Sequence, residues 1–112
     1  MIIHFRNSKL EKLVNSKNDL IRKYGQRQAE ALVRRLGQLE SISNLALVRL
    51  SAGARCHELK ADRAGQFSVD LVHPYRLIFV PTNDPIPYKP DGGLDWSRIT
   101  QIEIIEVIDT HG

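Results

Sequence analysis

The period of the hydrophobic pattern changes at Gly53, and this change constrains the fold more than any other feature of the sequence. Before Gly53, apolar residues recur three and four positions apart, which is typical of helices with one buried face. After Gly53 they alternate with polar residues, which is typical of strands. Helices followed by strands predict an α+β domain, with a small antiparallel sheet and the N-terminal helices packed on one of its faces.

The first part of the chain contains one strand and then helices. We expect the strand over 2–6, followed by a short helix that begins at the capping residues Asn7 and Ser8. A longer helix begins at Asn18 or Asp19 and runs through 39, with glycines at 25 and 37 as its weak points. Ser43–Asn44 caps a last short helix over 45–50.

The second part is expected to form three strands, over 66–72, 75–80 and 99–108. His73–Pro74 is a tight connection between the first two of them. Four of the five prolines lie within 81–95, which therefore forms a loop. The last strand is apolar on both faces near its end, and this pattern is typical of a central strand.

The length and the cysteine count limit the class of protein. A chain of 112 residues predicts one domain, over 1–112. Cys56 is the only cysteine, so no intrachain disulfide forms, which fits a reducing cytoplasm. No apolar run approaches the roughly 20 residues that span a membrane, and the first ten residues lack the apolar core of a secretory signal.

Charge is distributed unevenly along the chain. Residues 1–65 contain 13 Lys and Arg against 6 Asp and Glu, whereas 66–112 contain 3 against 7. The basic half is rich in arginine, which favours a polyanionic partner such as nucleic acid or an acidic protein. A well-solvated helical face explains the same charges without any partner.

The segment from Arg55 to Phe67 is the first candidate for chemistry. It brings His57, Lys60 and Arg63 into a short stretch that leads into a strand. Histidine exchanges protons near neutral pH, and Lys and Arg hold phosphate oxygens. The alternative is an ordinary charged turn.

Arg76 is the second candidate, because it interrupts an otherwise apolar strand. A buried or half-buried guanidinium needs a partner or a groove to offset its desolvation. Contact with a ligand and pairing with Asp70 across the hairpin are equally compatible with the spacing.

The third candidate is the segment that carries Asp109 and His111. Strand alternation places both on one face with Val107, where the carboxylate would orient the histidine and raise its pKa. A frayed terminus is the alternative.

Cys56 next to His57 does not make a nucleophilic dyad, because neighbours in a strand point apart, so we interpret Cys56 as a small buried hydrophobe. A metal site would need His57, His111 and a carboxylate to converge, which we rank well below acid–base use.

Taken together in this order, the three segments resemble the HigB-type toxins of the RelE superfamily, which are ribosome-dependent mRNA endonucleases of bacterial toxin–antitoxin systems. The run HELKADRAGQFSV over 57–69 resembles the family signature His-x-Leu-Lys-Gly-x-(Lys/Arg)-x-Gly-x-(aromatic)-Ser-(aliphatic). YRLIF over 75–79 is similar to its Trp-Arg-(aliphatic)-x-Phe strand, and IDTH over 108–111 to its terminal Asp-Tyr-His. The resemblance covers nearly the whole chain.

The resemblance implies a RelE-like fold and a metal-independent endoribonuclease without cofactors. It implies functional roles for His57, Lys60, Arg76, Asp109 and His111. It also implies that the basic half binds mRNA and ribosomal RNA through Arg34, Arg35, Arg55 and Arg63. The implied partners are the ribosome and a helix-turn-helix antitoxin of the HigA type.

The sequence departs from the family at three places. Thr110 stands where the family has tyrosine, Ala61 stands where it has glycine, and the proline-rich loop 81–96 is longer than the family's hairpin turn and offers Tyr88 and Trp96 for base stacking. A catalytically impaired module that binds RNA, ribosome or antitoxin is therefore an alternative, and a plain interaction protein is another. The nuclease hypothesis expects His57, Lys60, Arg76 and His111 in one concave patch.

Overall fold

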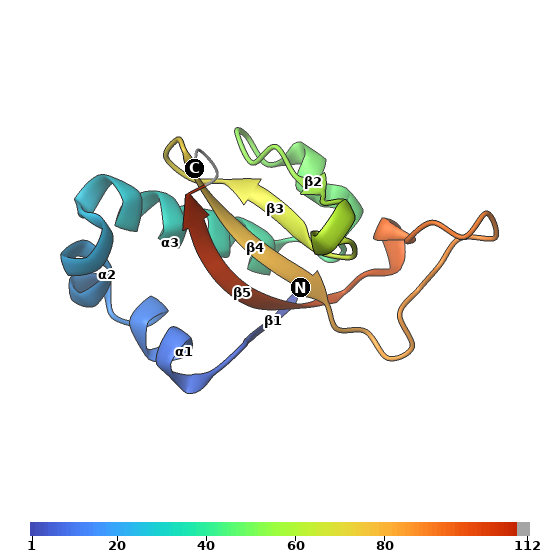
Figure 1. Cartoon of the computed structure of the whole chain (residues 1–112), viewed down its shortest axis with the longest axis horizontal. Coiled ribbons are helices and arrows are strands. Elements are labelled where there is room, and N and C mark those ends of the chain that lie inside the picture. The colour runs from blue at the N-terminus through green and yellow to red at the C-terminus, as the bar shows by residue number, and fades with distance from the viewer. Residues whose placement is uncertain (110–112) are drawn as a thin grey trace.

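The computed structural model describes residues 1–109, which form an α+β fold with one five-stranded sheet (Figure 1). The strand order is β1-β5-β4-β3-β2. The strands are β1 (Ile2–Phe5), β2 (His57–Glu58), β3 (Phe67–Asp70), β4 (Tyr75–Pro81) and β5 (Gln101–Asp109). The α-helices are α1 (Ser8–Val14), α2 (Lys17–Tyr24) and α3 (Gln26–Ser41), and the 3-10 helices are η1 (Leu45–Leu50), η2 (Ala61–Arg63) and η3 (Trp96–Arg98). The α+β prediction is confirmed.

The sheet is mixed rather than wholly antiparallel. β2, β3, β4 and β5 form antiparallel pairs, but β1 lies parallel to β5, with Ile2 opposite Gln101 and Phe5 opposite Ile104. The helical segment that follows β1 is long enough to allow either a parallel or an antiparallel pairing of β1 with its neighbour. The sequence therefore did not determine the direction of β1 in the sheet. β5 has a strand on both sides over its first half and is central there. The two-sided apolar pattern that favoured a central strand lies nearer its end, where the residues after Ile104 are only partly buried or exposed.

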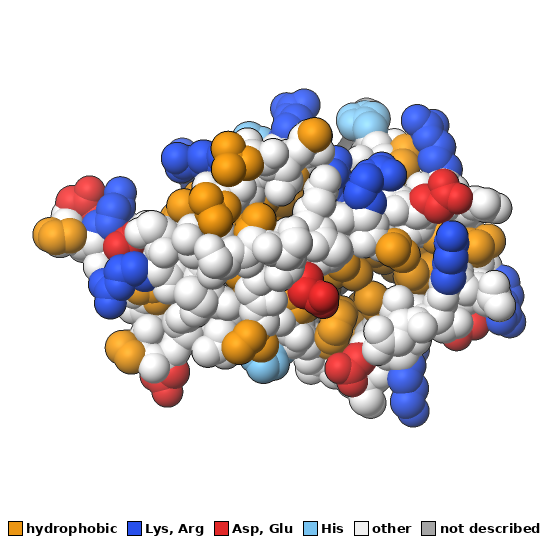
Figure 2. Space-filling view, turned by 180° about the vertical axis from the view of Figure 1, so that it is seen from behind, with side chains coloured by type: hydrophobic (Ala, Val, Ile, Leu, Met, Phe, Trp, Pro, Cys, Tyr) orange, Lys and Arg blue, Asp and Glu red, His pale blue; other side chains and the backbone are white. Residues whose placement is uncertain are grey.

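Helices cover only one face of this sheet, and the core lies between them and the strands. In Figure 1, α3 passes behind β4 and β5. Its buried face packs on side chains that alternate along the strands. The core includes Leu20, Ala29, Leu32, Leu39, Phe67, Val69, Leu77, Phe79, Ile102 and Ile104. Seen from the helix-covered side, Lys and Arg side chains are spread over the surface, several of them over the end formed by α1 and α2 (Figure 2).

The long helix expected from Asn18 or Asp19 onward is two helices. α2 begins earlier, because Ser16 Oγ accepts a hydrogen bond from the Asp19 amide at 3.2 Å. Gly25 then separates α2 from α3 with φ of +84°, a conformation that favours glycine. Gly37 stays within α3. The cap at Asn7 is confirmed, since its Oδ1 accepts from the Leu10 amide at 2.8 Å.

Several short elements differ in type from the prediction or were not predicted. The segment 45–50 is a 3-10 helix, and the two-residue strand β2 was not expected. The proline-rich loop is ordered by a bridge between Tyr88 and Leu94 and by η3. Over 1–109, no helix combines the length and the apolar character that crossing a membrane requires.

Candidate functional site

The face of the sheet opposite the helices carries three side chains that the sequence singled out, His57, Asp70 and Arg76. Strand register places His57, Ser68, Ile78 and Glu106 opposite one another in one row. The next row contains Asp70, Arg76 and Ile108. Directly paired residues point to the same side of a sheet, and so do residues two apart along a strand. We call this surface the open face.

Part of the open face is covered by the turn that follows β2. Arg63 on η2 forms an ion pair with Glu106 on β5, with Nη2 2.7 Å from Oε1, and its Nη1 donates to Gln66 Oε1 at 2.8 Å. Strands lie about 4.8 Å apart, so Arg63 reaches β5 only because η2 leans over β3 and β4. This cover explains why Ser68 and Ile78 are both fully buried although they point away from the helices.

The uncovered part of the open face centres on Asp70. Its carboxylate lies between two guanidinium groups, with Oδ1 3.4 Å from Arg76 Nε and Oδ2 3.6 Å from Arg55 Nε. The alternative of pairing between Arg76 and Asp70 is therefore confirmed. Arg76 is half-buried, whereas Arg55 is largely exposed. The ion pair with Asp70 keeps the Arg76 guanidinium on the open face.

A pocket of about 200 Å³ lies at this ion-pair cluster. Arg55, Asp70 and Arg76 line it together with the β3–β4 turn, including His73. Arg55 has φ of +46°, which is strained for a residue other than glycine. Such strain is concentrated at functional positions. Two guanidinium groups at a small pocket with one carboxylate suit a singly charged phosphodiester.

His57 and Lys60 are both exposed beside this surface. His57 is two strands away from Arg76 and one row along, which separates their Cα atoms by about 12 Å from sheet spacings. A ligand that contacts both side chains would have to bridge this distance. Lys60 precedes η2, where the chain reverses through Ala61, with φ of +56°, and Gly65, with φ of +86°.

Asp109 is not on the open face. It pairs with Tyr75, one residue beyond Arg76 and Ile108, and alternation directs it to the helix side. Asp109 is exposed there. Thr110 and His111 lie outside the described residues, so the expected Asp109–His111 pair is not tested.

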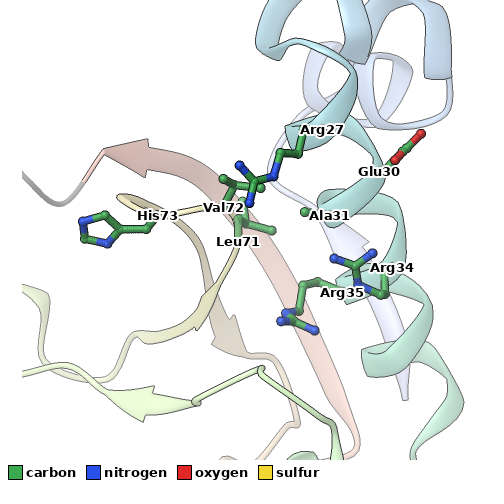
Figure 3. A pocket seen from close by; sticks show the side chains of 8 residues that line it. All are labelled: Arg27, Glu30, Ala31, Arg34, Arg35, Leu71, Val72 and His73. Atoms are coloured by element: carbon green, nitrogen blue, oxygen red, sulfur yellow. The ribbon is translucent and has the colours of Figure 1, made fainter.

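The two arginines predicted on α3 have different environments. Arg35 is buried, with 8% of its surface exposed, and it supports the fold. Its Nε donates to the Asp70 carbonyl at 2.7 Å, and its Nη1 donates to Ala52 O at 3.1 Å and to Gln38 Oε1 at 2.8 Å. Arg34 is exposed. Both lie apart from the open face, beside a pocket of about 570 Å³ (Figure 3).

Cys56 is packed against the core, as expected for a small hydrophobe. Burial raises the pKa of its thiol to about 12, although the nearby Arg49 lowers it. The thiol is therefore protonated at neutral pH and is a poor nucleophile. Over 1–109, no three His, Cys, Asp or Glu side chains gather into a group that could hold a metal ion.

Two features of the site escaped the sequence analysis, and the expectation that Trp96 is available for base stacking needs correction. Glu106 is the partner of Arg63, but the pairing depends on a register shift in β5 next to Ile78 and Phe79, which no pattern announces. Ser68 Oγ is buried without a hydrogen-bond partner among the described residues. Trp96 is not free for stacking on one side, because its ring packs edge-on against Phe67 and under Arg49.

Comparison of the chain with protein-family models, with curated proteins and with solved structures gave no match.

Proposed function

We propose that this protein is the toxin of a type II toxin–antitoxin system and cleaves mRNA on the ribosome. The observation that carries the proposal is the placement of Arg76 and His57 on the same open face, with the small pocket at Arg55 and Arg76 beside them. The order of the three motifs, which resembles the HigB-type toxins, supports it independently. A strongly basic first half suits an RNA substrate.

The reaction would be metal-independent RNA cleavage through the ribose 2′-OH. The 2′-oxygen attacks the phosphorus as a base removes its proton, and the bond to the 5′-oxygen breaks as an acid supplies one. Arg76 and Lys60 would stabilise the charge on the pentacoordinate phosphate. His57 and His111 would share the acid and base roles, with Asp109 orienting His111. The exposed position of His57 suits a group that must meet an incoming strand.

The proposal includes three partners. mRNA would occupy the open face, and Arg34, Arg55 and Arg63 would contact this strand or the ribosomal RNA around it. A helix-turn-helix antitoxin of the HigA type would neutralise the toxin in the cytoplasm. No cofactor has a part in this chemistry.

A second function is favoured by one specific observation. Asp109 lies on the opposite side of the sheet from Arg76, and Arg63 and Arg76 are each neutralised by a carboxylate of the chain itself. A catalytic centre that needs Asp109 and Arg76 together is not assembled by these positions alone. A RelE-like module that binds RNA, ribosome or antitoxin without cleavage is therefore the alternative.

The two functions are separated by mapping mRNA ends after brief expression in cells without the antitoxin. The nuclease predicts new 5′ ends within translated messages, and these ends should disappear in Arg76→Ala and His111→Ala variants. If the wild-type protein associates with ribosomes but produces no new 5′ ends, the nuclease function is refuted and the binding module is supported. Wild-type protein that neither cuts mRNA nor binds ribosomes or RNA would refute both.

A further inference from the structure

A second basic groove lies on the other side of the β3–β4 turn from the open face. It is a pocket of about 570 Å³ between α3 and the segment Leu71–His73 (Figure 3). Arg27, Arg34 and Arg35 line it from the helix, and His73 lines it from the turn. His73 also lines the small pocket at Arg76, so the two cavities adjoin the same turn. We call this larger pocket the α3 groove.

The walls of the α3 groove are held firmly. Gln28 is buried and binds the backbone of Val72 twice, with Oε1 accepting from its amide at 2.9 Å and Nε2 donating to its carbonyl at 3.2 Å. Arg35 fixes the end of β3 through the Asp70 carbonyl. These contacts tie the turn to α3 and leave the groove between them preformed. A preformed cavity loses little entropy when a ligand binds.

The charge of the groove is unbalanced. Three guanidinium groups face one carboxylate, and that carboxylate, Glu30, accepts a hydrogen bond from Gln26 at 3.0 Å and points away from the turn in Figure 3. Burial and, after it, the neighbouring Arg34 lower the pKa of Arg35, whereas Asp70 raises it. Arg35 donates hydrogen bonds within the fold, so Arg27 and Arg34 are the exposed arginines that line the groove.

We propose that the α3 groove binds the phosphodiester backbone of single-stranded RNA where the strand leaves the open face and passes round the β3–β4 turn. This rests on the proposed function and adds a second contact region to it. Arg27 and Arg34 are seven residues apart on one helix, which places them two turns apart on the same side. Two arginines in a row along a groove suit successive phosphates of one strand.

The test compares RNA binding by a double variant and a matched control. The probe is a 2′-O-methyl oligonucleotide of about twelve nucleotides, a length within the usual range of single-strand sites, and it cannot be cleaved through its 2′-oxygen. The double variant Arg27→Ala/Arg34→Ala changes two exposed helical arginines. The control Arg6→Ala/Arg22→Ala removes the same charge from exposed positions that do not line the groove. Circular dichroism confirms that both variants are folded.

We expect the groove variant to bind the long probe about tenfold more weakly at moderate salt, and its plot of log affinity against log salt to flatten by about 1.4, which is two phosphates. The control should keep most of the wild-type slope. A trinucleotide, which is too short to reach both cavities, should bind the groove variant and the wild type equally well. Equal slopes for the two variants, or equal losses for the trinucleotide, would overturn the proposal.

Two further measurements separate the outcomes. Poly-glutamate that displaces the probe as effectively as unlabelled RNA would identify an acidic polypeptide as the ligand and exclude the RNA assignment. Cleavage of an unmodified RNA by ribosomes loaded with the wild type is assayed in parallel. Groove-dependent binding without cleavage would refute the nuclease function and support RNA binding by the α3 groove. Cleavage without any effect of the groove variant on binding would support the nuclease function and refute RNA binding by the groove.

Discussion

Arg76 and Asp70 face each other across the β3–β4 hairpin, with Arg76 Nε 3.4 Å from Asp70 Oδ1. The same carboxylate also faces Arg55 at 3.6 Å, so one acid holds two guanidinium groups beside a small pocket. The pair orients Arg76 and limits the positive charge of the pocket at the same time. Changing the acid and leaving both arginines in place therefore removes both effects.

The variant Asp70→Asn should destabilise the protein by about 1 kcal/mol at low ionic strength, because two partly exposed ion pairs are lost and two cations remain side by side. Screening by salt should reduce this loss. Urea denaturation at low and high salt measures it. A loss that does not change with salt would show that the carboxylate acts through packing rather than charge.

Removal of His57 should impair chemistry and leave folding intact. His57 is exposed on the short edge strand β2, so His57→Ala should change the free energy of unfolding by less than about 0.5 kcal/mol. mRNA cleavage should fall by roughly 100- to 10,000-fold if the imidazole transfers a proton in the reaction. The matched control is His4→Ala, another exposed histidine of the sheet, which binds Gln101 at 3.3 Å and should cleave normally. Equal cleavage by His57→Ala and wild type would remove His57 from the mechanism.

Ala61→Gly should stabilise the protein. Ala61 has φ of +56°, where an L side chain costs about 1 kcal/mol and glycine costs none. The side chain is exposed, so little packing is lost with it. Thermal unfolding should show a rise in Tm of several degrees. Ala64→Gly is the control, because Ala64 has φ of −53° and the same change there should only destabilise.

Gln28→Ala should loosen the β3–β4 turn. The amide and the carbonyl of Val72 each lose a hydrogen bond to the buried Gln28 side chain, which predicts a loss of about 1–3 kcal/mol in denaturant unfolding. Hydrogen exchange at 71–73 should accelerate at the same time. Gln26→Ala, which removes only an exposed bond to Glu30, should cost a few tenths of a kcal/mol. Similar losses in the two variants would contradict the role of Gln28 as a clamp.

The Cys56 thiol should resist alkylation in the folded protein. Its pKa is about 12 in the fold and about 8.5 when unfolded, so at pH 8 the native thiolate is scarce. Between these values only the unfolded chain loses the proton, and stability therefore falls as pH rises through this window. Iodoacetamide should react far faster in urea than in buffer. The stability advantage of wild type over Cys56→Ala should shrink above about pH 8.5. Fast labelling of the native protein would contradict the burial of the thiol.

The sequence predicted the helical and stranded halves of the fold because the period of its apolar residues is local information. It also offered Asp70 as one of two alternatives for Arg76, since a tight His73–Pro74 connection leaves Asp70 opposite it. The break at Gly25 was harder to place because the apolar face continues on both sides of it, and a single residue with positive φ leaves no trace in that pattern.

The positions of Asp109 and Arg63 depend on long-range geometry. Ile105 has no partner across β4, and this irregularity determines which face each later residue of β5 occupies. Likewise Arg63 and Glu106 are 43 residues apart and meet only because η2 leans across the sheet. No local pattern contains either relationship, so the sequence located the candidate residues without showing which of them lie together.

The parallel pairing of β1 with β5 has a consequence for the order in which the protein is made. Ile2 pairs with Gln101, which is synthesised almost a hundred residues after it. Until then, β1 has no partner, and the strand that separates it from β4 does not exist. Arg63 also waits for Glu106 before η2 can be fixed over the sheet. A nascent chain can therefore pair β3 with β4 early, but it completes the open face, with Glu106 and the cover of η2, only after β5 has emerged.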